Sequence, residues 1–150
     1  MPKKIIILEN IRSAYNVGNV IRTADALGRE VRITGYTPSP LDHPKVKKTS
    51  LGAEDSVALK QFDYTHDAIA YAKEQKIWII AAEITPDAID LQSFSENNRA
   101  DIAIVFGNEV EGVLPETLKS IDQVVFIPMQ WVKESLNIGQ STAIFMRALR

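Results

Sequence analysis

The sequence predicts an α/β fold in which a mostly parallel sheet is flanked by helices. Five short apolar runs, rich in β-branched residues, alternate along the chain with stretches whose apolar residues recur every three or four positions. The runs are nearly continuous instead of alternating between apolar and polar, which is typical of strands covered on both faces. Strands that alternate with helices in this order favour parallel pairing through crossover connections.

The predicted strands are these five apolar runs and one weaker candidate. The five are Lys4–Leu8, Val31–Thr34, Ile77–Ala81, Ile102–Phe106 and Val124–Ile127, and the weaker one is Ser56–Leu59. The predicted helices are Val17–Leu27, Thr65–Lys73, Pro115–Ser120 and Ile138–Leu149. Asn16 and Asn137 are candidate N-caps for the first and the last of them, and Gly28 is a stop signal for the first. Three prolines mark one irregular loop, from about Tyr36 to Ala53.

Length and composition set further limits. The chain has 150 residues, which suits one domain spanning residues 1–150. It has no cysteine and only two histidines, so disulfides are excluded and a protein-bound metal is not expected. The apolar run near the N-terminus is too short for a signal peptide, and no run approaches the roughly 18 residues of a membrane span. We therefore expect a soluble, cytoplasmic protein without a membrane partner.

The net charge of −2 gives no bulk signal for nucleic-acid binding. Positive charge is nevertheless gathered locally, because Lys45, Lys47 and Lys48 stand within four positions of one another. A nucleic-acid contact and an ordinary solvated loop both account for this cluster.

Three polar loops follow predicted strands, where ligands bind in open α/β sheets. They are Glu9–Arg22, the loop after Phe106 and Ile127–Gln140. The first contains a single glycine, Gly18, so the G-x-G-x-x-G fingerprint of a dinucleotide-dependent oxidoreductase is missing. The G-x-S-x-G elbow of serine hydrolases is missing as well.

Particular residues in these loops have two interpretations each. Gly107, directly after a strand, either begins a surface turn or lets a ligand approach the backbone closely. Arg22 either binds a phosphate or lies exposed on a helix face. Ser135 and Asn137 stand near a helix N-terminus, where capping or ligand binding explains them equally.

At these loops the sequence resembles the SpoU/TrmH family of the SPOUT superfamily, which are S-adenosylmethionine-dependent RNA ribose 2′-O-methyltransferases. The matching motifs are "NVGNVIRTADALG" from Asn16, "KTSLGAE" from Lys48, "IVFGNEVEGV" from Ile104 and "IPMQWVKESLNIGQSTA" from Ile127. They cover nearly the whole chain in the family's order.

The resemblance implies a SPOUT-type fold with a C-terminal trefoil knot, a homodimer, and an RNA substrate, more in keeping with tRNA than with rRNA. It implies that the cofactor S-adenosylmethionine is bound, without a metal, by Ala82, Gly107, Ile127, Ser135 and Leu136. It assigns catalysis to Arg22, with Asn16 and Asn137 positioning the ribose or ordering the loops. Glu109 would hold Arg22 or Asn16, either within one chain or across a dimer interface, whereas Glu111 is a solvated loop acid. The alternative is a non-catalytic RNA-binding protein that retains the SPOUT fold.

The sequence departs from the family pattern in two places. The family commonly reads S-L-N-V-S at the end of the third loop, whereas this chain reads Ser135-Leu136-Asn137-Ile138-Gly139-Gln140. A glycine in the first turn of a helix lets another chain or a ligand approach closely. Trp131 suits stacking on a base and packing at a subunit interface equally well.

Overall fold

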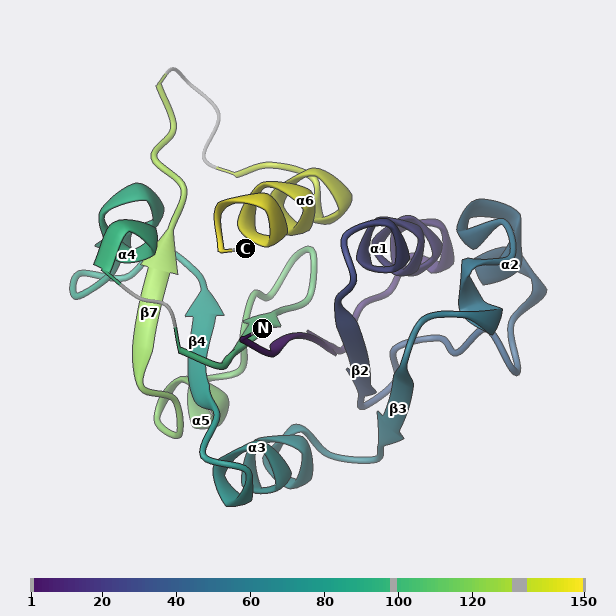
Figure 1. Ribbon diagram of the computed structural model, residues 1–150, viewed down its shortest axis with the longest axis horizontal. Coiled ribbons are helices and arrows are strands. Elements are labelled where there is room, and N and C mark those ends of the chain that lie inside the picture. The colour runs from purple at the N-terminus through teal and green to yellow at the C-terminus, as the bar shows by residue number, and fades with distance from the viewer. Residues whose placement is uncertain (1, 98–99, 131–134, 150) are drawn as a thin grey trace.

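A parallel sheet between two layers of helices forms the body of the protein (Figure 1). The structure is a computed structural model that describes residues 2–97, 100–130 and 135–149. Its strands are β1 (Lys4–Glu9), β2 (Glu30–Thr34), β3 (Leu59–Phe62), β4 (Trp78–Ala82), β5 (Ile89–Asp90), β6 (Ile102–Phe106) and β7 (Gln123–Phe126). In the described residues they form one seven-stranded sheet in the order β3-β2-β1-β6-β4-β7-β5, and every pairing is parallel.

The helices cover both faces of this sheet. They are α1 (Ala14–Ala26), α2 (Pro44–Ser50), α3 (Thr65–Glu74), α4 (Leu91–Asn97), α5 (Pro115–Leu118) and α6 (Ile138–Ala148), with a 3-10 turn at Ala53–Asp55. Figure 1 shows α1, α2, α4 and α6 on one side of the sheet and α3 and α5 on the other. None of the helices in the described ranges is long and apolar enough to cross a membrane.

Strand β1 shows why the apolar runs are continuous. Ile6 and Leu8 pack into the core on the α1 side, whereas Ile5 and Ile7 pack into the core on the α3 side. All four side chains are completely buried. A strand covered on both faces needs an apolar residue at every position. The predicted α/β class and parallel pairing are therefore confirmed.

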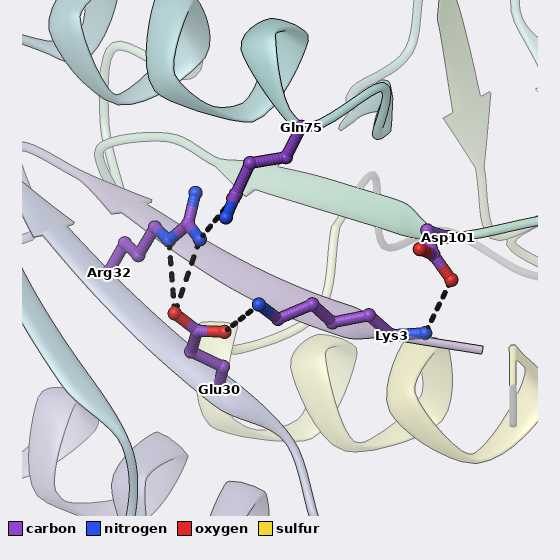
Figure 2. A network of polar contacts seen from close by, with 5 residues as sticks. All are labelled: Lys3, Glu30, Arg32, Gln75 and Asp101. Carbon is purple, nitrogen blue, oxygen red and sulfur yellow. Dashed lines mark hydrogen bonds and ion pairs between the residues drawn. The ribbon is translucent and has the colours of Figure 1, made fainter. Parts of the chain in front are cut away.

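One buried ion pair stabilises the α3 side of the sheet. Arg32 of β2 is completely buried, and its Nη2 donates to Glu30 Oε1 at 3.2 Å and to Gln75 Oε1 at 3.2 Å. Figure 2 shows that Glu30 also faces Lys3, whose Nζ lies 3.4 Å from Glu30 Oε2. Lys3 is in turn tied through its backbone N–H to Asp101. The network links the start of β2 to the N-terminal residues and to α3.

The region predicted to be irregular, Tyr36 to Ala53, contains a helix, α2, which was not predicted because prolines were interpreted as marks of a loop. Pro44 occupies the first turn of α2, a position where a missing N–H costs nothing. This helix crosses α1 so closely that a Cβ at Gly18 would overlap Thr49 Oγ1 and the carbonyl of Val46. Gly18 is thus a helix-packing residue.

Some element boundaries also differ from the prediction, and two short elements were not predicted. Helix α1 begins at Ala14, and its N-cap is Ser13, whose hydroxyl accepts from the Asn16 N–H, so Asn16 lies inside the first turn. Strand β3 begins at Leu59, where the register with Val31 of β2 places it, and not at Ser56. Strand β5 was not predicted, because its two residues carry no periodic pattern. Helix α4, with seven residues, was not predicted either.

The strand order brings the loops after several strands together at one edge of the sheet. The chain forms β4 before it returns to form β6 between β1 and β4. Because all strands are parallel, the loops after β1, β4, β6 and β7 leave the same edge. Open α/β sheets bind ligands at the carboxyl ends of their strands, at a place where the strand order reverses.

Candidate active site

A pocket of about 840 Å³ opens at the carboxyl ends of β4, β6 and β7, beside the start of α6. Its size falls in the roughly 300–1,000 Å³ range of small-molecule sites. Most of its lining is apolar or glycine, with a few polar groups. The described lining residues are Ala82, Glu83, Ile84, Phe106, Gly107, Asn108, Glu109, Val110, Gly112, Val125, Phe126, Ile127, Met129, Ser135, Leu136, Asn137, Ile138, Ser141 and Phe145.

The structure brings the five residues expected to bind the cofactor around this one pocket. Ala82 ends β4, Gly107 follows β6 and Ile127 follows β7, while Ser135 and Leu136 lie just before α6. They come from four segments that together span more than fifty positions of the sequence, from Ala82 to Leu136, and the sheet places them together. Trp131, for which the sequence left two interpretations, lies outside the described residues.

The loop 107–113 is a tightly bonded turn. Asn108 and Gly112 exchange both backbone hydrogen bonds, at 3.1 and 2.9 Å. The Asn108 side chain is buried, and its Oδ1 accepts from the N–H groups of Val110 and Glu111 at 2.8 and 2.9 Å. Its Nδ2 donates to the Asn10 carbonyl at 2.9 Å. Asn108 therefore fixes the turn from within, a role that the sequence analysis missed although an asparagine after glycine is a turn signal.

The structure changes the explanation of Gly107. A Cβ at this position would overlap the carbonyl of Gly112 and the amide nitrogen of Val113. The backbone that approaches Gly107 so closely belongs to the same loop, so the tightness of the turn already requires a glycine here. Gly107 lines the pocket, but a ligand is not needed to explain it.

Two carboxylates that the sequence analysis did not single out hold this loop in place. Glu83, directly after β4, accepts from the Val113 N–H at 3.1 Å and from the Ile84 N–H at 3.1 Å. Glu9, completely buried at the end of β1, accepts from the Leu114 N–H at 2.8 Å and from the Thr117 hydroxyl at 2.5 Å. Both are acids at strand ends, which is the signal that could have drawn attention to them.

Glu109 binds the beginning of α1. Its carboxylate accepts from the backbone N–H groups of Arg12 at 2.9 Å and Ser13 at 3.0 Å, and from Asn16 Nδ2 at 3.4 Å. Partial burial opposes ionisation, but the backbone hydrogen bonds from Arg12 and Ser13, with that from the Asn16 side chain, outweigh it and hold the pKa of Glu109 below its usual value. Glu109 is therefore an ionised group that receives hydrogen bonds, and it is poorly suited to act as a base.

Asn137 connects α6 to the same cluster. Its Oδ1 accepts from the Gly139 N–H at 2.8 Å, so the predicted N-cap is confirmed. Its Nδ2 donates to Asn16 Oδ1 at 3.3 Å. Glu109, Asn16 and Asn137 thus form one continuous chain of side chains from three elements at the rim of the pocket. We refer to these three residues as the rim cluster.

Gly139, the departure from the family pattern, lies against this cluster. A Cβ on Gly139 would lie 3.2 Å from Asn137 Oδ1 and 3.6 Å from Asn19 Cβ. The space is narrow enough that even alanine at position 139 would press on the capping side chain.

Arg22 does not join the rim cluster. Its side chain is exposed on α1, it does not line the pocket, and it makes no hydrogen bond or ion pair with the described residues. The expected contact of Glu109 is therefore made with Asn16 and not with Arg22 in this chain. Among the residues that the structure describes, no group of three histidines, cysteines or acids could hold a metal ion.

Comparisons with known proteins agree with this architecture. The model of the SpoU rRNA Methylase family matches residues 3–147. A tRNA (guanosine(18)-2′-O)-methyltransferase from Thermus thermophilus is 29% identical over 149 residues, which are 97% of this chain and 73% of that protein. The 23S rRNA (guanosine-2′-O-)-methyltransferase RlmB from Escherichia coli is 29% identical over 140 residues, covering 93% of this chain and 56% of the relative.

Solved structures show the same fold. An AdoMet-bound rRNA methyltransferase from Sinorhizobium meliloti superposes with a TM-score of 0.89 at 22% identity, over 99% of this chain and 56% of that chain. The SpoU methyltransferase AviRb from Streptomyces viridochromogenes gives a TM-score of 0.88 at 21% identity, over 98% of this chain and 58% of that chain. Because the family model spans almost every residue, the chain belongs to the SpoU rRNA Methylase family.

Proposed function

We propose that this protein transfers a methyl group from S-adenosylmethionine to a ribose 2′-hydroxyl of RNA. The observation that carries the proposal is the rim cluster of Glu109, Asn16 and Asn137 at the mouth of the pocket at the carboxyl edge of the sheet. The pocket for the methyl donor and the polar residues that would hold the acceptor ribose thus lie next to each other. A transfer between two substrates requires this proximity.

The pocket suits the methyl donor in shape and chemistry. Its apolar wall includes Phe106, Ile127 and Leu136, which suit contact with the faces of an adenine ring. Ala82 and Gly107 keep the wall free of bulky side chains. S-adenosylmethionine supplies a methyl group that its own sulfonium makes electrophilic. The protein therefore has to orient the acceptor hydroxyl and to favour loss of its proton.

The residues of the rim cluster divide this work. Asn16 and Asn137 present amide groups that can hold a ribose, and Glu109 fixes Asn16 and the start of α1. Guanidinium groups stay protonated in proteins. Arg22 therefore acts as a cation that holds a neighbouring phosphate and stabilises the developing alkoxide.

A dimer with a shared site completes the proposal. What supports it is the position of Arg22, which is exposed and separate from the pocket of its own chain. Half-exposed Tyr15 on α1 and Ile144 on α6 supply apolar surface on two helices that pack against each other. The trefoil knot belongs to the proposal as well. It is supported by the family resemblance and by the described residues of the third loop, 127, 129 and 135–137, which line the same pocket as the loops after β4 and β6.

A mixing experiment tests the shared site. Arg22→Ala and Asn137→Ser should each lose methyl transfer when they are purified alone. If one chain supplies Arg22 to its partner's pocket, half of the randomly paired dimers carry one intact site, so the mixture recovers about a quarter of wild-type activity. A mixture that stays inactive although the chains exchange would refute the shared site.

RNA binding is proposed for a basic surface on α1 and α2. Arg12, Arg22, Lys45, Lys47 and Lys48 are exposed, and none of them makes an ion pair with the described residues. The contact between Thr49 Oγ1 and the Tyr15 carbonyl, at 2.9 Å, joins α2 to α1, and these two helices carry all of the charges except Arg12, which lies just before α1. Each phosphate contact contributes about one unit to the slope of log affinity against log salt concentration. Lys48→Ala should reduce that slope by about one, and Lys73→Ala, on the opposite face of the sheet, should not.

The RNA is proposed to be tRNA, as several relatives are named for tRNA and the chain matches them over nearly its full length. The cytoplasmic location expected from the sequence stays a prediction.

Transfer of a labelled methyl group to purified tRNA and rRNA, followed by mapping of the 2′-O-methyl position, tests both activity and substrate. Arg22→Ala should reduce transfer by orders of magnitude while S-adenosylmethionine affinity is unchanged. RNA binding without any transfer by the wild type would favour the alternative, a non-catalytic RNA-binding protein.

A further inference from the structure

The described lining of the pocket carries negative side chains and no positive ones. Glu83 and Glu109 are its two carboxylates, and the other described lining residues include no lysine, arginine or histidine. The remaining polar side chains are neutral amides and hydroxyls. A pocket with this charge favours a ligand that brings positive charge.

The two carboxylates are not equivalent. Glu109 lies at the rim, where it binds the start of α1 through Arg12, Ser13 and Asn16. Glu83 follows β4 directly, next to Ala82, and its carboxylate lies against Gly112 in the pocket wall. It accepts one N–H on each oxygen, from Val113 and Ile84, and forms no ion pair with the described residues.

These contacts orient Glu83 without neutralising it. Backbone N–H groups carry partial charges, so the carboxylate keeps its net negative charge. Each carboxylate oxygen can accept more than one hydrogen bond, so each retains acceptor capacity. Glu83 is thus a fixed negative charge at a defined place in the wall.

We infer that Glu83 makes the pocket select the positively charged methyl donor over the neutral thioether product. This inference rests on the proposed function. S-adenosylmethionine and S-adenosylhomocysteine differ by a methyl group and by the positive charge on sulfur. A carboxylate in the wall attracts the sulfonium and loses that attraction once the methyl group has left, which promotes release of the product.

The expected size of the effect follows from Coulomb's law. A pair of unit charges about 8 Å apart, in a medium of effective dielectric constant about 40, changes the ratio of the two affinities about six-fold. Because the thioether lacks the charge, its affinity should change little.

The chain offers a matched pair of variants. Glu83→Gln removes the charge while keeping the size of the side chain and one acceptor oxygen. Glu111→Gln removes the same charge from an exposed residue of the loop 107–113 that does not line the pocket. The second variant controls for a general change in the charge of the protein.

Calorimetric titration of the full-length wild type and both variants with the donor and with the thioether tests the inference. Glu83→Gln should weaken donor binding about six-fold relative to thioether binding, and Glu111→Gln should leave the ratio unchanged. Thioether affinity near that of the wild type also reports that the pocket is intact. If the affinities for the donor and for the thioether fell equally, Glu83 would only hold the loop in place. That result, or an unchanged ratio of donor affinity to thioether affinity, would overturn the inference and leave the proposed function standing. A wild type that binds neither ligand overturns the proposed function together with the inference.

Discussion

Asn137 performs two tasks with separate atoms, so substitutions can separate stability from activity. Its Oδ1 caps α6 through the Gly139 N–H at 2.8 Å, and its Nδ2 reaches Asn16 Oδ1 at 3.3 Å. Asn137→Ala removes both contacts. Loss of an N-cap costs about 1 kcal/mol in free energy of unfolding. The longer, exposed amide contact adds only a few tenths of a kcal/mol.

The expected change in melting temperature follows from this free energy. For a chain of this length, 1 kcal/mol corresponds to about 2–4 °C, so Asn137→Ala should lower the melting temperature by a few degrees. Asn137→Ser keeps a capping oxygen but lacks the amide donor, so it should recover most of the lost stability. Its methyl transfer should stay as low as that of Asn137→Ala.

Thermal unfolding followed by circular dichroism and a labelled-methyl transfer assay measure the two quantities. An Asn137→Ala protein that melts with the wild type would show that the cap does not stabilise α6. If Asn137→Ser recovered activity along with stability, the contact with Asn16 would have no part in the reaction, and the proposed role of the rim cluster would be wrong.

Three further outcomes follow from the contacts. Glu30→Gln leaves the buried Arg32 without a carboxylate partner and should cost about 3 kcal/mol or more in urea unfolding, whereas Lys3→Ala, which removes only the exposed partner, should cost about 0.5 kcal/mol or less. Gly107→Ala must displace the backbone at Val113 and should cost about 1–3 kcal/mol, measured in the same way. Because the pKa of Glu109 is lower in the folded protein, its ionised carboxylate stabilises the fold at pH values above the pKa of an unfolded carboxylate. This contribution disappears as the pH falls through the pKa of the folded protein. The difference in free energy of unfolding between the wild type and Glu109→Gln should therefore vanish in acid.

The sheet could be predicted from the sequence because its strands are buried on both faces. Ile5 to Leu8 alternate between two cores, and that requirement leaves a continuous apolar run that cannot be mistaken for an exposed strand. Where an element is short or buries only one or two residues, the local pattern is too weak. Strand β5 has two residues, and α2 is held against α1 by Val46 and Ser50 after a proline-rich stretch.

The site was predicted unevenly for a related reason. Motif resemblance placed Ala82, Ile127 and Leu136 at the pocket, since strand ends of a parallel sheet meet at one edge. It could not show which backbone groups each acid would contact. Glu83 and Glu9 escaped notice because their partners, the N–H groups of Val113 and Leu114, lie 30 and 105 positions away in the sequence.

These carboxylates explain how a wall of the pocket is built before any ligand arrives. Glu9, Glu83 and Glu109 each bind backbone N–H groups that join the loop 107–114 to β1, to β4 and to the start of α1. Had lysine or arginine side chains anchored the loop instead, each acid would have been neutralised by its partner. Anchoring through N–H groups fixes the loop and leaves the charges of Glu83 and Glu109 in the wall. The carboxylates that hold the loop through backbone N–H groups therefore also make the pocket complementary to a cationic methyl donor.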